Sequence, residues 1–351
     1  MNQFHDLLIQ ARDSGASDLH LVTGTPPFIR INGEIIIMDY ESLTAPKIHS
    51  LIMEVINPDQ MKRFEHDKEL CLAFSLPGVG YFRVSLYYQR GCMEAAIRLG
   101  ILEVKSFDEL GLPPILVELS RKTSGLLLIT GATGMGKTTT FNAIIDFINR
   151  ERRCKIITIE DPVEYIHTSK KSIIVQQEAY TDAKSFSRAL VHILRQNPDI
   201  IGVGEMRDLE TISTTLTAAE TGHLVIATLH TIDSASSVDR IIDVFPPHQQ
   251  EQIRYQLASV LVGVICQRLM PRADKKGRIV ACEVMISNDA VKNLIKDKKT
   301  IQLDNIIRTS SSQHMQSMDE VLKDLYIKGL ITYDIALSTA KNPRILDREK
   351  K

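Results

Sequence analysis

The sequence lacks paired cysteines. Its 5 cysteines are scattered along the chain, and none stands in a Cys-x-x-Cys arrangement. Structural zinc sites and disulfide frameworks both place cysteines at short, regular spacings, so the pattern disfavours both kinds of site. We interpret these residues as reduced and mostly buried thiols. They are Cys71, Cys92, Cys154, Cys266 and Cys282.

Long apolar runs and a strong net charge are also missing. The chain has no run of about eighteen apolar residues, which a membrane-spanning helix needs. Its first ten residues, MNQFHDLLIQ, mix polarities and include Asp6, so they do not resemble a signal peptide. The formal net charge of -1 creates no general attraction for nucleic acid. We therefore predict a cytoplasmic protein that binds no nucleic acid and can still dock on a membrane protein.

The composition that is present predicts two globular domains. The chain has 351 residues, of which 44% are hydrophobic and 24% charged. Residues 1–100 begin with a helical pattern and continue with short β-rich runs, two of them joined by an Asn32-Gly33 turn. This predicts a small α+β domain with an antiparallel sheet. Residues 101–114 then read as a linker, and residues 115–351 as the second domain.

One stretch of the second domain carries a specific chemical signal. Residues 131–140 read GATGMGKTTT and fit G-x-x-x-x-G-K-[ST], with Gly131, Gly136, Lys137 and Thr138 at the fixed positions. A short apolar run precedes the motif and a helical pattern follows it, which predicts strand, glycine loop and helix. In that arrangement backbone N–H groups and a helix N-terminus face a phosphate.

The motif assigns roles to individual residues. Lys137 is expected to reach the β- and γ-phosphates of ATP, and the Thr138 hydroxyl to bind Mg²⁺. The remaining nucleotide contacts are expected from the loop itself. Together the predicted nucleotide-binding residues are Gly131, Thr133, Gly134, Met135, Gly136, Lys137, Thr138 and Thr139.

After the glycine loop, strand and helix patterns alternate up to His230, which predicts a mostly parallel sheet with helices on both faces. Ligands bind at the carboxyl ends of the strands in such sheets. Beyond Asp233 the pattern becomes mainly helical, with one long helix over residues 248–268 and a hairpin over residues 269–285.

Two glutamates are candidates for the hydrolytic chemistry. Glu164 closes an acidic turn after one strand, and Glu205 follows the apolar run Ile-Ile-Gly-Val-Gly. One carboxylate should hold Mg²⁺ through water while the other orients the attacking water. We favour Glu164 as general base and Glu205 on the Mg²⁺ side, an assignment that the sequence leaves open. Glu160 and Asp161 fit ordinary turn chemistry as well as a direct role.

Histidines and arginines supply further candidates. His223 and His230 flank one apolar strand, and we expect both near the nucleotide, in contact with the γ-phosphate or with a neighbouring subunit. Arg83 and Arg98 lie on late strands of the first domain, as does Arg90. Solvated strand positions are the default interpretation, but in a ring such arginines can reach a neighbour's γ-phosphate.

Taken together, these motifs resemble the secretion-type P-loop ATPases, and within them the type IV pilus retraction ATPase (PilT) group. The resemblance extends over nearly the whole chain. The matching segments are SDLHL at 17–21, RING at 30–33, GATGMGKT at 131–138, IEDPVE at 159–164, IIGVGEMRDLE at 200–210 and TAAETGH with TLHT at 217–231.

The resemblance implies a PAS-like N-terminal α+β domain, a RecA-like ATPase domain with a helical C-terminal part, and a homohexameric ring. It also implies ATP and Mg²⁺ as cofactors, a PilC-like platform protein of the inner membrane as partner, and a second retraction ATPase as a further one. By similarity, the catalytic residues are Glu164, Glu205, His223 and His230, with Arg83 and Arg98 added from the neighbouring subunit. The implied function is ATP-driven pilus retraction at the cytoplasmic side of the inner membrane.

Two departures from the group keep alternatives open. Met135 replaces a small polar loop residue, with little expected loss because the loop backbone binds phosphate. The retraction motif AIRNLIRE appears as AVKNLIKD at 290–297, with lysines for both arginines, and lysine does not reproduce a bidentate guanidinium contact. An accessory PilU-like paralogue therefore remains an alternative. A pilus assembly or type II secretion motor is disfavoured by the start at the PAS-like segment and by the absence of Cys-x-x-Cys, and a silent nucleotide-binding subunit by the intact motifs.

Overall fold

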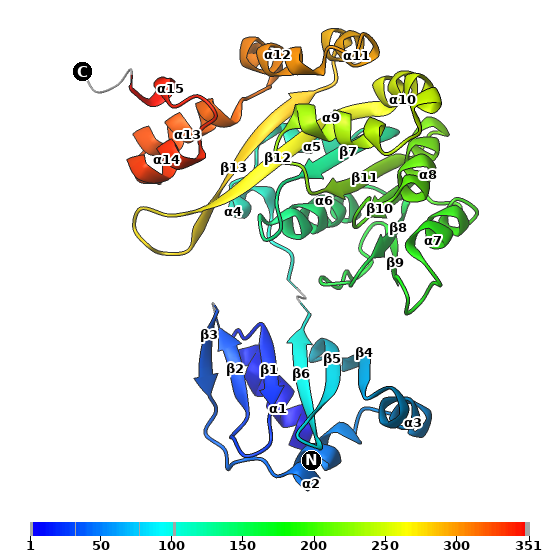
Figure 1. Cartoon of the computed structure of the whole chain (residues 1–351), viewed down its shortest axis with the longest axis vertical. Helices are drawn as coiled ribbons and strands as arrows, with labels where there is room; N and C mark the ends of the chain where they lie inside the picture. The colour runs from blue at the N-terminus through cyan, green and yellow to red at the C-terminus, as the bar shows by residue number, and fades with distance from the viewer. Residues whose placement is uncertain (1–2, 32, 77, 101–102, 348–351) are drawn as a thin grey trace. The chain divides into compact units, whose positions relative to one another are not determined.

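A computed structural model describes residues 3–31, 33–76, 78–100 and 103–347 (Figure 1). The chain divides into two compact units. The first runs to Glu103 and includes Glu164–Ile166, whereas the second comprises Val104–Val163 and the chain from His167 onward. Within the described ranges, no helix combines the length and apolarity needed to cross a membrane.

The first unit is built on a six-stranded antiparallel sheet in the order β3-β2-β1-β6-β5-β4. This agrees with the expected antiparallel α+β architecture, while Asn32 of the predicted turn lies outside the described residues. One helix escaped prediction: its start is a capping box between Asn57 and Gln60, with Pro58 in the first turn. The elements are α1 (Gln3–Asp13), β1 (Asp18–Leu21), β2 (Phe28–Ile31), β3 (Glu34–Ile37), α2 (Ala45–Ile52), α3 (Pro58–Asp67), β4 (Glu69–Leu76), β5 (Gly80–Gln89) and β6 (Cys92–Leu99).

The second unit is built on a seven-stranded sheet in the order β13-β12-β7-β11-β10-β8-β9. All neighbouring pairs are parallel except β12 with β13, which confirms the predicted, mostly parallel sheet. The central strands are buried along their whole length, as expected for a sheet covered on both faces. The strands are β7 (Gly125–Thr130), β8 (Lys155–Glu160), β9 (Ile173–Glu178), β10 (Ile200–Val203), β11 (Leu224–Leu229), β12 (Leu261–Pro271) and β13 (Arg278–Ile286).

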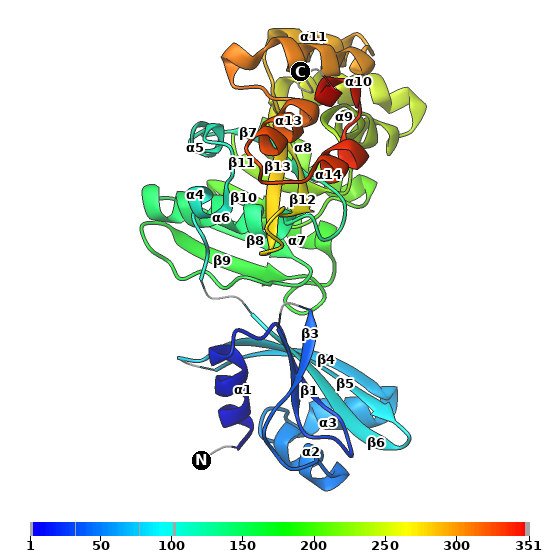
Figure 2. The same cartoon turned by 90° about the vertical axis from the view of Figure 1, so that its left-hand side faces the viewer.

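Helices pack on both faces of this sheet. Ile201 and Val203 point into the core shared with α8 and α10, whereas a Cβ on Gly202 would lie 2.7 Å from the Phe141 ring of α6, on the opposite face. Figures 1 and 2 both place α13 and α14 beside β13, on which α13 packs. The helices are α4 (Phe107–Leu110), α5 (Ile115–Ser120), α6 (Lys137–Glu151), α7 (Phe186–Ile193), α8 (Leu209–Glu220), α9 (Ser234–Asp243), α10 (Pro247–Val260), α11 (Asp289–Lys296), α12 (Leu303–Thr309), α13 (Met318–Ile327), α14 (Tyr333–Thr339) and α15 (Arg344–Asp347), with 3-10 turns at Thr300–Gln302 and Ser311–Gln313.

The long helix predicted over residues 248–268 is wrong in its second half. Helix α10 ends at Val260, and the chain continues as β12, which pairs with β7 in the centre of the sheet. The β-branched residues around Gly263 favour a strand, and a Cβ at Gly263 would lie 2.9 Å from the Met285 carbonyl oxygen of the paired strand. Tertiary pairing thus outweighs the helical pattern over residues 261–268.

The segment predicted as a linker contains a short helix. Ser106 caps α4 through a capping box with Glu109, and Phe107 is buried with its ring stacked on Phe147 of α6. The second half of the 101–114 segment is therefore anchored to the second unit. Residues 101 and 102 lie outside the described ranges.

A buried histidine makes the stability of this fold dependent on pH. The His167 side chain is 1% exposed, and its Nε2 lies 2.7 Å from Asn142 Oδ1 of α6. Burial lowers the pKa of His167 to about 4, because Asp146 at 4.0 Å compensates only partly and Lys170 opposes the charged form as well. The folded state therefore holds this imidazole neutral.

We expect acid to destabilise the protein through this group. Between pH 6.5 and 4 the unfolded chain binds a proton at His167 and the folded chain does not. The free energy of unfolding therefore falls as pH falls through this window. At pH 5 the expected loss relative to pH 7 is about 2 kcal/mol. Urea unfolding of wild type and His167→Gln at both pH values measures it. Parallel pH profiles of the two proteins would contradict this assignment.

Candidate nucleotide site

The phosphate loop follows directly from the end of β7. Gly131 has φ 144°, and a Cβ there would lie 2.5 Å from the backbone oxygen of Gln267, so this position requires glycine. Gly136 has φ 83° and ends the loop as the N-cap of α6. Because α6 begins at Lys137, its unpaired backbone N–H groups face the loop.

Strand β12 contacts the phosphate loop at Met135. The Gln267 side chain, 1% exposed, donates from Nε2 to the Met135 carbonyl oxygen at 2.7 Å. The Leu269 backbone N–H also approaches Met135 Sδ at 3.3 Å. Met135 therefore packs against β12 with its side chain while its backbone belongs to the loop. Gln267 was not predicted as a site residue, because the helix expected over residues 248–268 covered its position.

The Lys137 ammonium group lies over the loop, where a phosphate would bind. Its Nζ donates to the carbonyl oxygens of Gly131 at 2.8 Å and Ala132 at 3.0 Å, and it lies 3.3 Å from His230 Nδ1. Burial lowers the pKa of Lys137, with Glu205 acting in the opposite direction. An anionic ligand would restore the charge balance of this buried cation, so the lysine fits a phosphate group.

Glu205, His230 and Arg207 form a connected cluster at the same edge of the sheet. His230 Nε2 lies 2.9 Å from Glu205 Oε1, and Arg207 NH2 lies 2.7 Å from Glu205 Oε2. Burial acts to raise the pKa of Glu205, but Arg207 and His230 outweigh it, and the net shift is downward. The carboxylate is therefore ionised at neutral pH. The Thr133 hydroxyl, 3.3 Å from His230 Nδ1, joins this cluster to the phosphate loop.

Other predicted site residues occupy the first turn of α6. Thr138 and Thr139 are partly exposed there, and Thr138 offers a hydroxyl next to the loop while its carbonyl accepts from Asn142 Nδ2 at 2.9 Å. Mg²⁺ is usually held by one or two protein oxygens together with phosphates and water. The described part of the chain has no cluster of three or more His, Cys, Asp or Glu able to hold a metal. The Thr138 hydroxyl and the ionised Glu205 thus fit Mg²⁺ that arrives with a nucleotide.

The acidic turn after β8 contains two glutamates, Glu160 and Glu164, in different surroundings. Glu160 is 3% exposed and accepts from the Thr158 hydroxyl at 2.7 Å, next to Gly204. Glu164 follows a cis Asp161-Pro162 bond and groups with the first unit. Among the described residues its carboxylate forms no hydrogen bond or ion pair. The role of Glu164 as general base therefore stays a prediction.

The structure contradicts the expected position of His223. His230 follows the carboxyl end of β11, but His223 immediately precedes its amino end. The six residues between them span roughly 20 Å in a strand. His223 Nδ1 lies 3.0 Å from the Ala218 carbonyl oxygen and 3.2 Å from the Thr221 hydroxyl. His223 therefore lies in the turn between α8 and β11, at the amino end of the parallel strands. The phosphate loop of the same chain follows the carboxyl end of β7, at the opposite edge of the sheet.

The two arginines of the first unit face each other on one side of its sheet. Arg83 on β5 and Arg98 on β6 are directly paired in register, on the face opposite the core residues Phe82 and Val84. Arg98 Nε lies 3.2 Å from Asp18 Oδ1. Two cations opposite each other repel, so an additional anion at this face would be stabilising. Arg90, by contrast, lies in the turn between the strands, with φ 50°.

Parallel strands, a glycine loop that opens a helix, a buried lysine and an ionised glutamate at the strand ends define a P-loop nucleotide hydrolase. The family comparison agrees: residues 90–328 match the model of the Type II/IV secretion system protein family. The chain is also 43% identical to the type IV pilus retraction ATPase PilT of Pseudomonas aeruginosa, over 96% of this chain and 98% of that protein.

A further relative and a solved structure extend this comparison. The type IV pilus ATPase PilU of Pseudomonas aeruginosa is 36% identical over 96% of this chain and 88% of its own length. A crystal structure of the pilus retraction motor PilT with bound ADP superposes with a TM-score of 0.90, at 43% identity and 99% coverage of both chains. The protein belongs to the GspE/PilT family of secretion ATPases, and it is an ATP hydrolase with the α/β fold of that family.

Proposed function

We propose that the protein is the motor that hydrolyses ATP to retract type IV pili, the process that powers twitching motility. The observation that carries this proposal is the connected set of Lys137, Glu205 and His230 at the phosphate loop. The 43% identity with a pilus retraction ATPase along nearly the whole chain supplies the biological context. A silent nucleotide-binding subunit would not need to keep these three groups in contact.

The proposed reaction is in-line attack of water on the γ-phosphate of ATP. Lys137 would bind the β- and γ-phosphates, while His230 would contact the γ-phosphate and is oriented by Glu205. Mg²⁺, held by Thr138 and through water by Glu205, would supply positive charge at the phosphates. We keep Glu164 as the proposed general base that orients the water. The remaining loop residues, Thr133, Gly134, Met135 and Thr139, would contribute backbone or hydroxyl contacts to the nucleotide.

The proposed assembly is a homohexamer in which the PAS-like first domain, residues 1–100, completes a neighbour's nucleotide site. Arg83 and Arg98 are suited to this role because they face each other across the strand pair. An external anion would reduce the repulsion between their two positive charges. For His223, the amino-end position leaves the subunit-contact role as our proposal. The residues 115–351 would form the RecA-like motor domain, with 101–114 connecting the two.

Mixed rings test whether Arg83 acts on a neighbouring subunit. Arg83→Ala alone is expected to lower kcat by about a thousandfold, as loss of an arginine finger does. Lys137→Met subunits cannot turn over ATP but still carry both arginines. Mixing the two inactive variants should therefore restore measurable ATP hydrolysis. If the mixture is no more active than its two components measured separately, Arg83 does not act between subunits.

The proposed location is the cytoplasmic face of the inner membrane, where a PilC-like platform protein would receive the motion of the ring. The second retraction ATPase remains a proposed partner.

Helix α11 carries the variant motif, on which the choice between the main and the accessory motor depends. There Val291 and Ile295 are buried, while Lys296 Nζ lies 5.9 Å from the Tyr255 ring of α10. Lysine and arginine can both make such a cation–π contact, so this contact does not require an arginine in α11.

Deleting the gene and counting surface pili by electron microscopy tests the proposed function. Excess pili together with lost twitching are expected for the main retraction motor. Bare cells would overturn the proposal in favour of an assembly motor. An unchanged pilus number would overturn the main-motor assignment and favour the accessory PilU-like role, for which the 36% identity with PilU provides precedent.

A further inference from the structure

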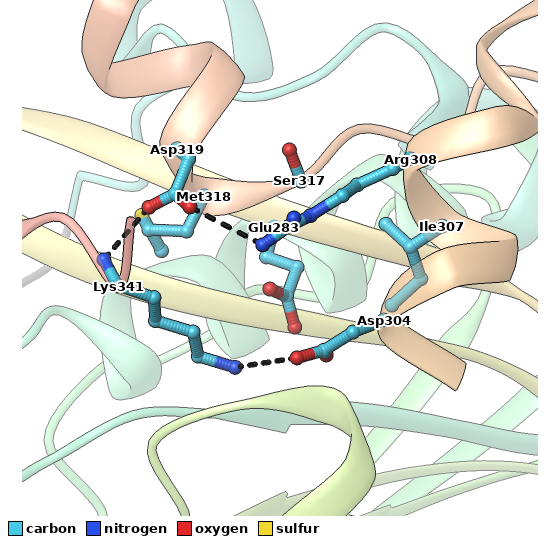
Figure 3. A pocket seen from close by; sticks show the side chains of 8 residues that line it. All are labelled: Glu283, Asp304, Ile307, Arg308, Ser317, Met318, Asp319 and Lys341. Atoms are coloured by element: carbon cyan, nitrogen blue, oxygen red, sulfur yellow. Dashed lines mark hydrogen bonds and ion pairs between the residues drawn. The ribbon is translucent and has the colours of Figure 1, made fainter. Parts of the chain in front are cut away.

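A cluster of charged side chains, of which Glu283 and Asp319 are buried, adjoins the loop of residues 230–233 that carries His230. Glu283 of β13, Asp304 and Arg308 of α12, Asp319 of α13 and Lys341 after α14 line a cavity of only about 10 Å³ (Figure 3). The space admits at most a single water molecule, so the cluster is not a ligand pocket. Its charges instead link these four segments of the chain.

The His230 loop, residues 230–233, contacts this cluster through its last residue, Asp233. Asp233 Oδ2 lies 2.8 Å from Lys341 Nζ, and the two side chains are 16% and 30% exposed. Asp233 also caps α9, because its Oδ1 accepts from the Ser236 backbone N–H at 2.8 Å. The next residue, Ser234, donates its backbone N–H and its hydroxyl to Glu283 Oε1. The end of the loop is thus held by two groups of the C-terminal part.

Lys341 is in turn fixed to the C-terminal helices. Its Nζ lies 3.4 Å from Asp304 Oδ2 of α12, and its backbone N–H donates to Asp319 Oδ1 of α13 at 2.8 Å. Dashed lines mark both interactions in Figure 3. Arg308 binds the other oxygen of Asp319. Burial acts to lower the pKa of Lys341, but Asp233 and the other carboxylates outweigh it and raise it. A charged Lys341 is therefore held between the His230 loop and two helices.

We propose that Lys341 is a positioning residue for His230: its ion pair with Asp233 links the nucleotide-sensing loop to α12 and α13. Only two residues separate Asp233 of this ion pair from His230, whose imidazole contacts Lys137 and Glu205. A shift of His230 on binding or release of a γ-phosphate therefore moves Asp233 and, through Lys341, the C-terminal helices. This inference rests on the proposed ATPase site, because His230 must face the nucleotide.

Paired substitutions separate positioning from simple stability. Asp233→Asn keeps an N-cap oxygen for Ser236 but removes the charge, and Lys341→Met keeps the length of the side chain. Each is expected to lower kcat about tenfold while changing KM less than about twofold. The double variant should be no slower than either single one. Lys341→Arg should retain most of the rate. Lys328→Met, which removes an exposed lysine at the end of α13 that pairs with Asp324, is the matched control and should retain full kcat.

Hydrogen exchange provides a readout independent of turnover. In wild type, binding of a non-hydrolysable ATP analogue should slow amide exchange in residues 303–309 and 340–342 as well as at the phosphate loop. In Lys341→Met the analogue should still protect the phosphate loop but no longer the two C-terminal segments. Equal C-terminal protection in both proteins, or rate losses of Asp233→Asn and Lys341→Met that multiply in the double variant, would overturn the proposal. If wild type binds the analogue and shows the coupling but hydrolyses no ATP, the proposed function fails while the link stands.

Discussion

Replacing Glu205 with glutamine is expected to lower the rate of ATP hydrolysis by about a thousandfold while ATP still binds. The carboxylate, ionised at neutral pH, accepts from both His230 and Arg207, and it lies at the strand end where Mg²⁺ is expected. Glutamine preserves the size of the side chain but removes the charge. The loss should therefore fall on kcat, because the glycine loop that binds phosphate remains intact.

Glu210→Gln is the matched control for this variant. Glu210 lies five residues further along the same motif, exposed in the first turn of α8. Neutralising it changes the same net charge without touching the cluster, so its steady-state rate should equal that of wild type. Glu205→Gln with more than about a tenth of the wild-type rate would show that this carboxylate has no central role.

Replacing Lys137 with methionine is expected to abolish both turnover and tight nucleotide binding. The buried ammonium group is held by the Gly131 and Ala132 carbonyl oxygens, directly over the expected phosphate position. Methionine fills the same volume without a charge, so the fold should remain while the affinity for ADP, measured by calorimetry, falls by about a hundredfold.

The exposed Lys122 just before β7 supplies the comparison for Lys137. Lys122→Met should bind ADP like wild type. Unchanged ADP affinity in Lys137→Met would place the nucleotide elsewhere than on this loop, whereas a similar loss in both variants would point to a general charge effect.

The phosphate loop could be predicted from the sequence because its determinants are local. Gly131 and Gly136 are required by backbone conformation within the loop itself, and the flanking strand and helix show clear patterns. Glu205 and His230 were also placed correctly, at carboxyl ends of parallel strands. Their mutual contact follows from the order of β10 and β11 as neighbours in the sheet.

Residues that act through long-range packing could not be predicted in the same way. Gln267 reaches the loop only because β12 pairs with β7, and the periodicity over that segment favoured a helix. Lys341 meets Asp233 more than a hundred residues away, through the packing of the C-terminal helices. Arg207 was within a quoted motif, yet nothing in its spacing indicated the ion pair with Glu205.

His223 shows the limit of reading strand boundaries. Its position next to an apolar strand was correct, but a strand has two ends, and a parallel sheet binds ligands at only one of them. The direction of the chain already distinguishes these ends: His223 precedes β11 and His230 follows it. Strand direction therefore has to accompany any prediction from flanking residues.

Live imaging of labelled pili, in cells whose only copy of this gene carries Glu205→Gln, tests directly whether this ATPase site powers retraction. A motor whose ATP hydrolysis drives retraction predicts pili that extend and then remain extended, with no twitching. Retraction at the wild-type frequency and speed in these cells would contradict the claim that this ATPase site powers pilus retraction.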